Sequence, residues 1–156
     1  MEPLLFGIAA ISTGVLGLSA GALVTEGAVL VPIWRGLAPE QFLAWYREHA
    51  GLLLRFFGPL EIVAAALACI TLGVAWYGGA RPMMPLAASA VLAVSVLGAF
   101  PLYFQGTNES FASGEIAPGD VPVELGRWAR WHWMRTIVAV LAFVSSTLGL
   151  AVLSGG

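Results

Sequence analysis

Long runs of apolar residues alternate with short polar segments along the chain. The apolar runs cover residues 3–34, 41–77, 83–104 and 121–153. Each is long enough for a helix to cross a bilayer, which takes about 20 residues. The pattern predicts an all-α fold, in which a single transmembrane domain over residues 1–156 forms an up-down-up-down bundle of four membrane-spanning helices.

Polar segments predict where these helices begin and end. Pro39 suits the first turn of the second helix, because the first N–H groups of a helix have no intrahelical partner. Asp120 is expected as the N-cap of the fourth helix, with Pro122 in its first turn. A kink is expected at Pro59, which cannot donate the helical hydrogen bond. Residues 105–122 predict the only long loop, between the third and fourth helices.

The composition supports a membrane location. The chain is 59% hydrophobic and 10% charged, whereas soluble domains carry about a quarter charged residues. Four spans leave little beyond connecting loops, so no soluble catalytic domain is expected. Glu2 stands where a secretory signal places a basic residue, so we expect the first span to be retained. All seven basic residues are Arg and form no basic block, which argues against a nucleic-acid partner. The single Cys69 excludes an intrachain disulfide.

The bundle topology gathers the unusual polar residues at one end. The end of the first span, the start of the second, the end of the third and the start of the fourth all face the same side of the membrane. That side carries Glu26, His49, Arg55, Glu61, Tyr103, Asn108, Glu109, Arg127, Arg130, His132 and Arg135. The opposite side carries only Glu2 and Arg81. We call the first of these the polar end.

Arginines near the span ends predict the orientation. Arg35, Arg47, Arg127 and Arg130 lie at the polar end, and Arg81 lies at the other. The positive-inside rule then places the polar end in the cytoplasm, with both termini outside. We expect the membrane to be a bacterial inner membrane.

A G-x-x-x-G pair lies in the first span, at Gly17 and Gly21. Such pairs let two helix backbones approach closely. The pair predicts close packing within the bundle, and a contact between subunits of a homo-oligomer is the alternative.

The most unusual segment is RWARWHWMRT, residues 127–136. On a helix, Trp128, Trp131, His132 and Arg135 share one face. One interpretation is an interfacial belt, in which Trp lies at headgroup level and Arg extends to water or lipid phosphate. For His132 and Arg135 we favour a functional role, because charges at such depth usually face an interior cavity.

Two glutamates, Glu26 and Glu61, also lie within the predicted spans, and their role is either functional or structural. An ionised Glu26 or Glu61 in hydrocarbon is costly, so each must be paired, protonated or in a wet pocket. Arg135 and Arg55 are the available countercharges. A purely structural network of ion pairs would satisfy the same requirement.

Only two histidines are present, and both are predicted at the polar end. If a metal or haem binds there, the expected donor is a neutral imidazole of His49 or His132, because Cys69 lies deep in the second span. A lone interfacial His without a ligand is the other interpretation of His49.

The topology and a few residues resemble a small four-helix membrane family that includes anthrone oxygenases. The similarity lies in Asn108 after the third span and in a W-x-x-x-H-x-x-R pattern, here Trp128, His132 and Arg135, that opens the fourth. The resemblance implies a membrane enzyme that acts on a lipophilic, often aromatic or polyketide-like substrate, by oxygenation.

A second resemblance is to the styrene oxide isomerases, which also have four spans. It rests on the segment EHAG after the start of the second helix and on Tyr103 and Asn108. It implies haem b with His49 as the axial metal ligand, at a site between subunits of a homo-oligomer. Arg55 and Trp128 are assigned with His49 to cofactor binding.

The leading hypothesis is a membrane-embedded oxidoreductase, oxygenase or isomerase with a pocket at the polar end, open to a lipophilic substrate from the bilayer. His132 is expected to act as acid, base or ligand, and Arg135 to stabilise negative charge. The remaining site residues are expected to donate hydrogen bonds (Asn108 and Tyr103) or to tune charge (Glu26 and Glu61). The alternative is a non-enzymatic membrane module, either a small transporter or an accessory subunit.

Overall fold

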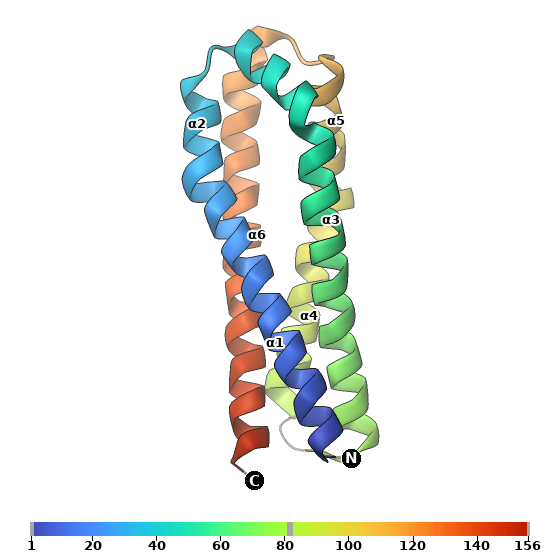
Figure 1. The fold of residues 1–156 in the computed structure, drawn as a ribbon. Coiled ribbons are helices and arrows are strands. Elements are labelled where there is room, and N and C mark those ends of the chain that lie inside the picture. The colour runs from blue at the N-terminus through green and yellow to red at the C-terminus, as the bar shows by residue number, and fades with distance from the viewer. Residues whose placement is uncertain (1, 81–82, 156) are drawn as a thin grey trace.

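Four long helical rods run side by side along the whole length of the molecule (Figure 1). The structure is a computed structural model, and it describes residues 2–80 and 83–155. Each rod is long and apolar enough to cross a membrane, and the described residues include no strand. The predicted all-α bundle of four membrane-spanning helices is therefore confirmed.

Two of the rods contain a π-helical turn, which the sequence analysis did not predict. The first rod joins α1 to α2 through η1, and the third joins α4 to α5 through η2. The second rod is a single helix, α3, and the fourth is a single helix, α6, preceded by the short η3. The bounds are α1 Glu2–Thr25, η1 Glu26–Leu30, α2 Val31–Gly36, α3 Pro39–Tyr77, α4 Met83–Ala99, η2 Phe100–Phe104, α5 Gln105–Ser113, η3 Pro118–Asp120 and α6 Val121–Ser154.

The long loop predicted at residues 105–122 is wrong. Helix α5 extends the third rod to Ser113, and Gly114 ends it with a φ of 75°, a left-handed conformation that glycine adopts without strain. The polar residues of α5 resemble a loop in sequence, but Phe111 is fully buried and packs edge-on against Phe42 at 5.1 Å between ring centroids. The buried ring of Phe111 thus holds the polar helix α5 against α3, and α5 extends the third rod beyond its apolar span.

The predicted helix starts are largely confirmed. Pro39 is the first residue of α3, and the side chain of Gln41 accepts a hydrogen bond from the Ala38 N–H at 3.2 Å. Asp120 directly precedes α6 and Pro122 lies in its first turn, but the Asp120 side chain makes no capping hydrogen bond. Helix α3 continues through Pro59.

The packing differs between the two halves of the bundle. Helices α1 and α4 each pack against both α3 and α6. In the half nearer the termini, the core between the rods is built mostly from alanine and other small residues, which allow close approach. At the polar end, large rings fill the wider space; they are Trp34, Phe42, Tyr46, Phe104, Phe111 and Trp128.

The two glycines of the G-x-x-x-G pair have different surroundings. A Cβ added to Gly17 would lie 3.0 Å from the ring of Phe143 on α6, so Gly17 serves packing within the bundle. Gly21 is exposed, and a Cβ added there would meet nothing within 4 Å.

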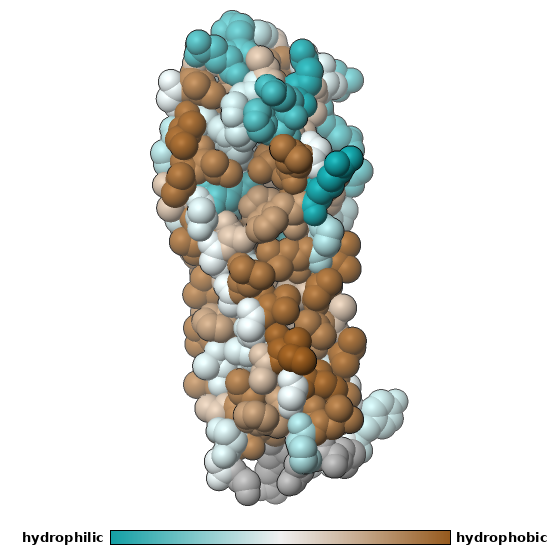
Figure 2. Space-filling view, viewed as in Figure 1, coloured by the Kyte–Doolittle hydropathy of each residue, from teal (hydrophilic) through white to brown (hydrophobic). Residues whose placement is uncertain are grey.

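The surface separates into an apolar body and a polar cap (Figure 2). Hydrophobic side chains cover most of the length, and hydrophilic side chains gather where α2 meets α3 and where α5 ends. Exposed residues in this cap include Arg35, Glu40, Gln41, Arg47 and Glu48. The predicted polar end is therefore confirmed. Arg81, the arginine at the opposite end on which the predicted orientation depends, lies outside the described residues.

Candidate functional site

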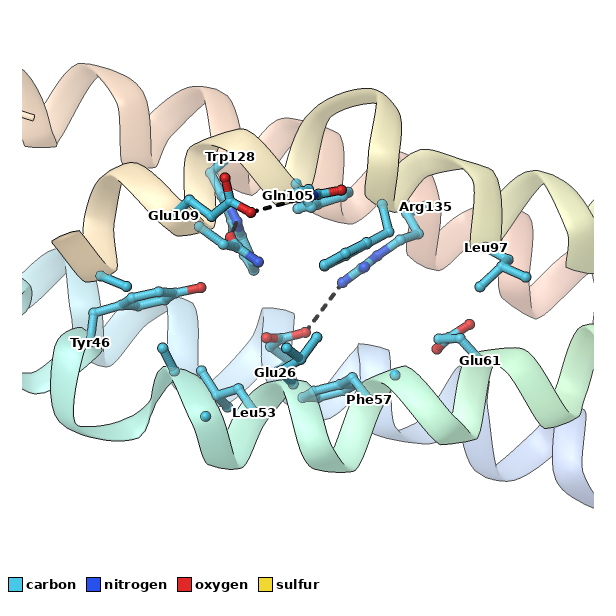
Figure 3. A pocket seen from close by; sticks show the side chains of 18 of the residues that line it. Glu26, Tyr46, Leu53, Phe57, Glu61, Leu97, Gln105, Glu109, Trp128 and Arg135 are labelled. Atoms are coloured by element: carbon cyan, nitrogen blue, oxygen red, sulfur yellow. Dashed lines mark hydrogen bonds and ion pairs between the residues drawn. The ribbon is translucent and has the colours of Figure 1, made fainter. Parts of the chain in front are cut away.

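A cavity of about 410 Å³ lies inside the polar half of the bundle. Small-molecule sites typically have volumes of roughly 300–1,000 Å³. Helix α3 forms one wall, and α4, η2 and α5 form the opposite wall, while Glu26, Trp128 and Arg135 close the back (Figure 3). Most of the lining is hydrophobic, so the few polar groups in it stand out.

The α3 wall follows the helical period. Tyr46, Ala50, Leu53, Phe57 and Glu61 all line the cavity, at spacings of three or four residues that keep them on one face of the helix. The side chains of Tyr46, Leu53, Phe57 and Glu61 project inward in Figure 3.

The cavity is open on one side, between α3 and α5. Leu54 and Ile62 belong to its lining, yet both are more than half exposed at the outer surface of α3. Across the opening, Gln105 and Glu109 are also exposed, and the Gln105 amide donates to Glu109 Oε1 at 3.2 Å. The opening is therefore flanked by apolar residues of α3 on one side and by polar residues of α5 on the other.

The back of the cavity holds a buried ionic cluster. Nη2 of Arg135 donates to Glu26 Oε2 at 3.4 Å and to Nδ1 of His132 at 3.1 Å. The Arg135 side chain is only 8% exposed, and its guanidinium carbon lies 4.1 Å from the centre of the Phe104 ring. No described residue accepts a hydrogen bond from the buried Nε of Arg135. Arg135 also lines the cavity, and its Nη1 donates to no described residue, so Nη1 is the guanidinium donor open to a ligand.

His132 supports this cluster from behind. Its side chain is fully buried and does not line the cavity. Nε2 donates to the main-chain carbonyl of Leu23 at 2.9 Å, so Nδ1 carries the lone pair that accepts from Arg135. Trp128 stacks on the imidazole, with 5.0 Å between ring centroids and 5° between planes.

Gly27 makes room for the His132 ring. A Cβ at position 27 would lie 3.0 Å from Cδ2 of His132 and 3.1 Å from its Nε2. Gly27 belongs to the π-helical turn η1, whose Glu26 carbonyl accepts from the N–H of Val31, five residues on. Such turns are found often at functional sites.

Asn108 and Trp128 contact each other at the cavity wall, and Asn108 accepts in this contact although the sequence analysis expected it to donate. The indole N–H of Trp128 donates to Oδ1 of Asn108 at 2.9 Å, and both residues line the cavity. Trp128 therefore connects Asn108 on α5 to the imidazole of His132 behind the cavity wall.

Glu61 lies in the same cavity but apart from the ionic cluster. It is 7% exposed, and Ser19 Oγ donates to its Oε1 at 3.0 Å. Arg55, proposed as a countercharge, is exposed and makes no ion pair with a described residue. The two residues are six positions apart on α3, so their side chains project roughly 120° apart around the helix. The predicted pairing with Arg55 is wrong.

Tyr103 and His49 both lie outside the cavity wall. The hydroxyl of Tyr103 donates to Glu124 Oε1 at 2.8 Å, and its ring stacks on Trp131 at 5.1 Å. The His49 ring stacks on Trp45 at 4.3 Å, with Nδ1 2.7 Å from the Trp45 carbonyl oxygen.

The donor set does not suit a haem in this cavity. Among the described residues that line it there is no His or Cys, the side chains that hold haem iron most often. Both ring nitrogens of His132 are already engaged within the protein. Residues 2–80 and 83–155 contain no cluster of three or more His, Cys, Asp or Glu able to hold a metal ion. The residues that line this cavity therefore do not fit a haem.

Several lining residues were missed by sequence reasoning. Tyr46 and Gln105 line the cavity, and Ser19 holds Glu61, whereas Glu109, which also lines it, was expected at the polar end but not in the site. Tyr46 had a usable signal, since it is 15 residues, or about four helical turns, before Glu61 on the same face. Ser19 had none, because a single Ser in an apolar helix commonly bonds to its own backbone.

Comparison of the chain with protein-family models, with curated proteins and with solved structures finds no match. The resemblances noted above therefore rest on their few residues alone.

Proposed function

We propose that this protein is a membrane-embedded enzyme that moves a proton on a small lipophilic substrate. The observation that carries the proposal is the contact of Arg135 with Glu26 at the back of an apolar cavity. A buried cation beside a buried carboxylate supplies an anion-stabilising group and a proton acceptor in one place.

Arg135 is assigned the stabilisation of negative charge. A carbonyl or phenolic oxygen of the substrate would accept from its guanidinium, whose Nη1 has no acceptor among the described residues. Apolar walls strengthen such an interaction, because little water is present to screen it.

Glu26 is assigned the proton transfer. In a β,γ-unsaturated ketone, its carboxylate takes a proton from the C–H between the carbonyl group and the double bond, and the electron pair of that bond passes into a dienolate held by Arg135. Return of the same proton to the γ-carbon moves the double bond into conjugation and completes an isomerisation. Substrate and product have equal oxidation states, so no oxidant or reductant is needed.

His132 is a positioning residue in this scheme. It touches no cavity surface, but its Nδ1 accepts from Arg135 and lies 3.5 Å from Glu26 Oε2. It therefore fixes the positions of the Arg135 guanidinium and the Glu26 carboxylate relative to each other. This assignment replaces the acid–base role expected of His132 from the sequence.

The test uses anthrone, a neutral aromatic ketone whose methylene C–H is activated by the carbonyl group. The protein is placed in lipid nanodiscs in D2O, and exchange of the methylene protons is followed by NMR. We expect exchange faster than with empty nanodiscs, and a loss of about 100-fold in Glu26→Gln, a typical contribution of one acid–base group. Arg135→Gln should lose a similar factor.

Glu48→Gln is the matched control, because Glu48 is an exposed carboxylate of α3 outside the cavity. Equal exchange in Glu26→Gln and in the unsubstituted protein would contradict the proposal. Oxygen uptake recorded in the same assay distinguishes isomerisation from oxygenation, in which dioxygen oxidises the substrate anion and is itself reduced.

A further inference from the structure

The cavity contains a carboxylate that no cation of the described chain balances. Glu61 accepts one hydrogen bond, from Ser19, and no Arg or His of the described residues lies within ion-pair distance of it. Its side chain projects into the cavity at the end away from Tyr46 (Figure 3).

The position of Glu61 along the bundle makes this arrangement costly. It lies 16 residues, or roughly 24 Å, from the end of α3 at Tyr77. The hydrocarbon core of a bilayer is about 30 Å thick, so Glu61 lies within it. A carboxylate at that depth needs a proton or a cation.

The remaining charges of the cavity do not provide that cation. Glu26, Glu61 and Glu109 line it together with one guanidinium, that of Arg135, which Glu26 already contacts. Aromatic rings in the cavity add to the preference for positive charge, because Phe57, one helical turn before Glu61, and Phe100 also line it, and the face of such a ring attracts an ammonium group.

We propose that the ligand of this cavity is a lipophilic amine, whose protonated nitrogen binds Glu61 while its apolar body lies against the α3 and α4 walls. This inference deepens the proposed function by naming the substrate class, and it rests on that function for the reacting group at Arg135. The ammonium group supplies the missing cation, and the cavity walls exclude water from the pair.

A pair of probes that differ only in charge tests the inference. Binding of 2-naphthylmethylamine and of 2-naphthylmethanol is measured by calorimetry at pH 7 on the protein in phosphatidylcholine nanodiscs, with empty nanodiscs subtracted. We expect the amine to bind about tenfold more tightly, the usual gain from a hydrogen bond to a charged group. In Glu61→Gln the two affinities should become equal. Glu48→Gln, outside the cavity, should retain the preference.

Ser19→Ala provides a second variant in case Glu61→Gln does not fold. It removes the hydroxyl that holds Oε1 and should reduce the preference for the amine without adding or removing a charge. Equal affinities for the two probes in the unsubstituted protein would overturn the inference, as would a preference that persists in Glu61→Gln. The anthrone assay reports separately on the proposed function, because its probe is neutral and reacts at Arg135 and Glu26.

Discussion

Nε2 of His132 donates to the main-chain carbonyl of Leu23 across 2.9 Å, joining two residues that are 109 positions apart in the chain. This bond links the fourth rod to the backbone of the first, beside the π-helical turn that contains Glu26. It also fixes the imidazole so that its other nitrogen accepts from Arg135. The geometry of the ionic cluster therefore depends on a contact that lies outside the cavity.

Replacing His132 by Ala should destabilise the protein as well as disturb the site. The change removes the bonds to Leu23 and Arg135 and leaves a buried gap beneath Trp128. We expect a loss of about 3 kcal/mol in the free energy of unfolding, measured by denaturant titration followed by Trp fluorescence. His49→Ala is the control, since the hydrogen bond and ring stacking of His49 involve only Trp45. Equal stability of the two variants would argue against this role.

Gly27→Ala tests whether the close approach of the His132 ring matters. The added Cβ would be 3.0 Å from Cδ2 of His132, so the ring must shift by a few tenths of an ångström, which disturbs its hydrogen bond to Leu23. We expect a lower melting temperature and slower anthrone exchange. Gly21→Ala, on the same rod, meets nothing within 4 Å and should be neutral or stabilising by up to about 1 kcal/mol, because Ala favours a helix over Gly. Identical behaviour of the two variants would contradict the importance of this contact.

The absorption spectrum of the purified protein tests the haem that one resemblance implies. No His or Cys of the described chain lines the cavity, and the His49 ring outside it is stacked on Trp45 with Nδ1 against the Trp45 carbonyl oxygen, so we expect no Soret band. A Soret band that disappears in His49→Ala would instead place a haem on the outer surface of α3. His132→Gln serves as the comparison, since His132 is buried away from any haem bound at His49.

Cysteine labelling tests the orientation that the arginines of the polar end predict. In a background in which Cys69, the only cysteine, is replaced by Ala, a cysteine at Ser113 should react with a membrane-impermeant maleimide only from the cytoplasmic side. A cysteine at Ser154 should react only from the opposite side. Both serines are exposed, so reagent access is not limited by the fold. The reverse labelling pattern would show that the positive-inside rule does not govern this chain.

Hydrophobic runs predicted the four spans well, because the bilayer requires each to be long and apolar. The same reasoning failed for α5, whose polar residues form a helix that Phe111 anchors from inside. Hydropathy measures the average polarity of a segment and does not register a single buried ring.

Part of the site was predictable because charge in hydrocarbon is expensive. Glu26, Glu61 and Arg135 were expected in an interior pocket from their depth, and the structure brings all three to one cavity. Depth does not give rotation about the helix axis, however, so Arg55 was expected inside and lies outside. Tyr103 lies within the π-helical turn η2, where the residue spacing departs from 3.6 per turn, so the usual helical period does not give its direction.

The side opening between α3 and α5 affects which ligand concentration determines how much of the cavity is occupied. For a molecule that enters through it from the bilayer, that concentration is the one in the lipid, which for an apolar compound greatly exceeds the concentration in water. Each added methylene group improves partitioning by about 0.8 kcal/mol, so the apparent KM in bulk solution should fall along a homologous series and shift with the ratio of lipid to protein. That trend ends where the molecule outgrows the 410 Å³ available to it.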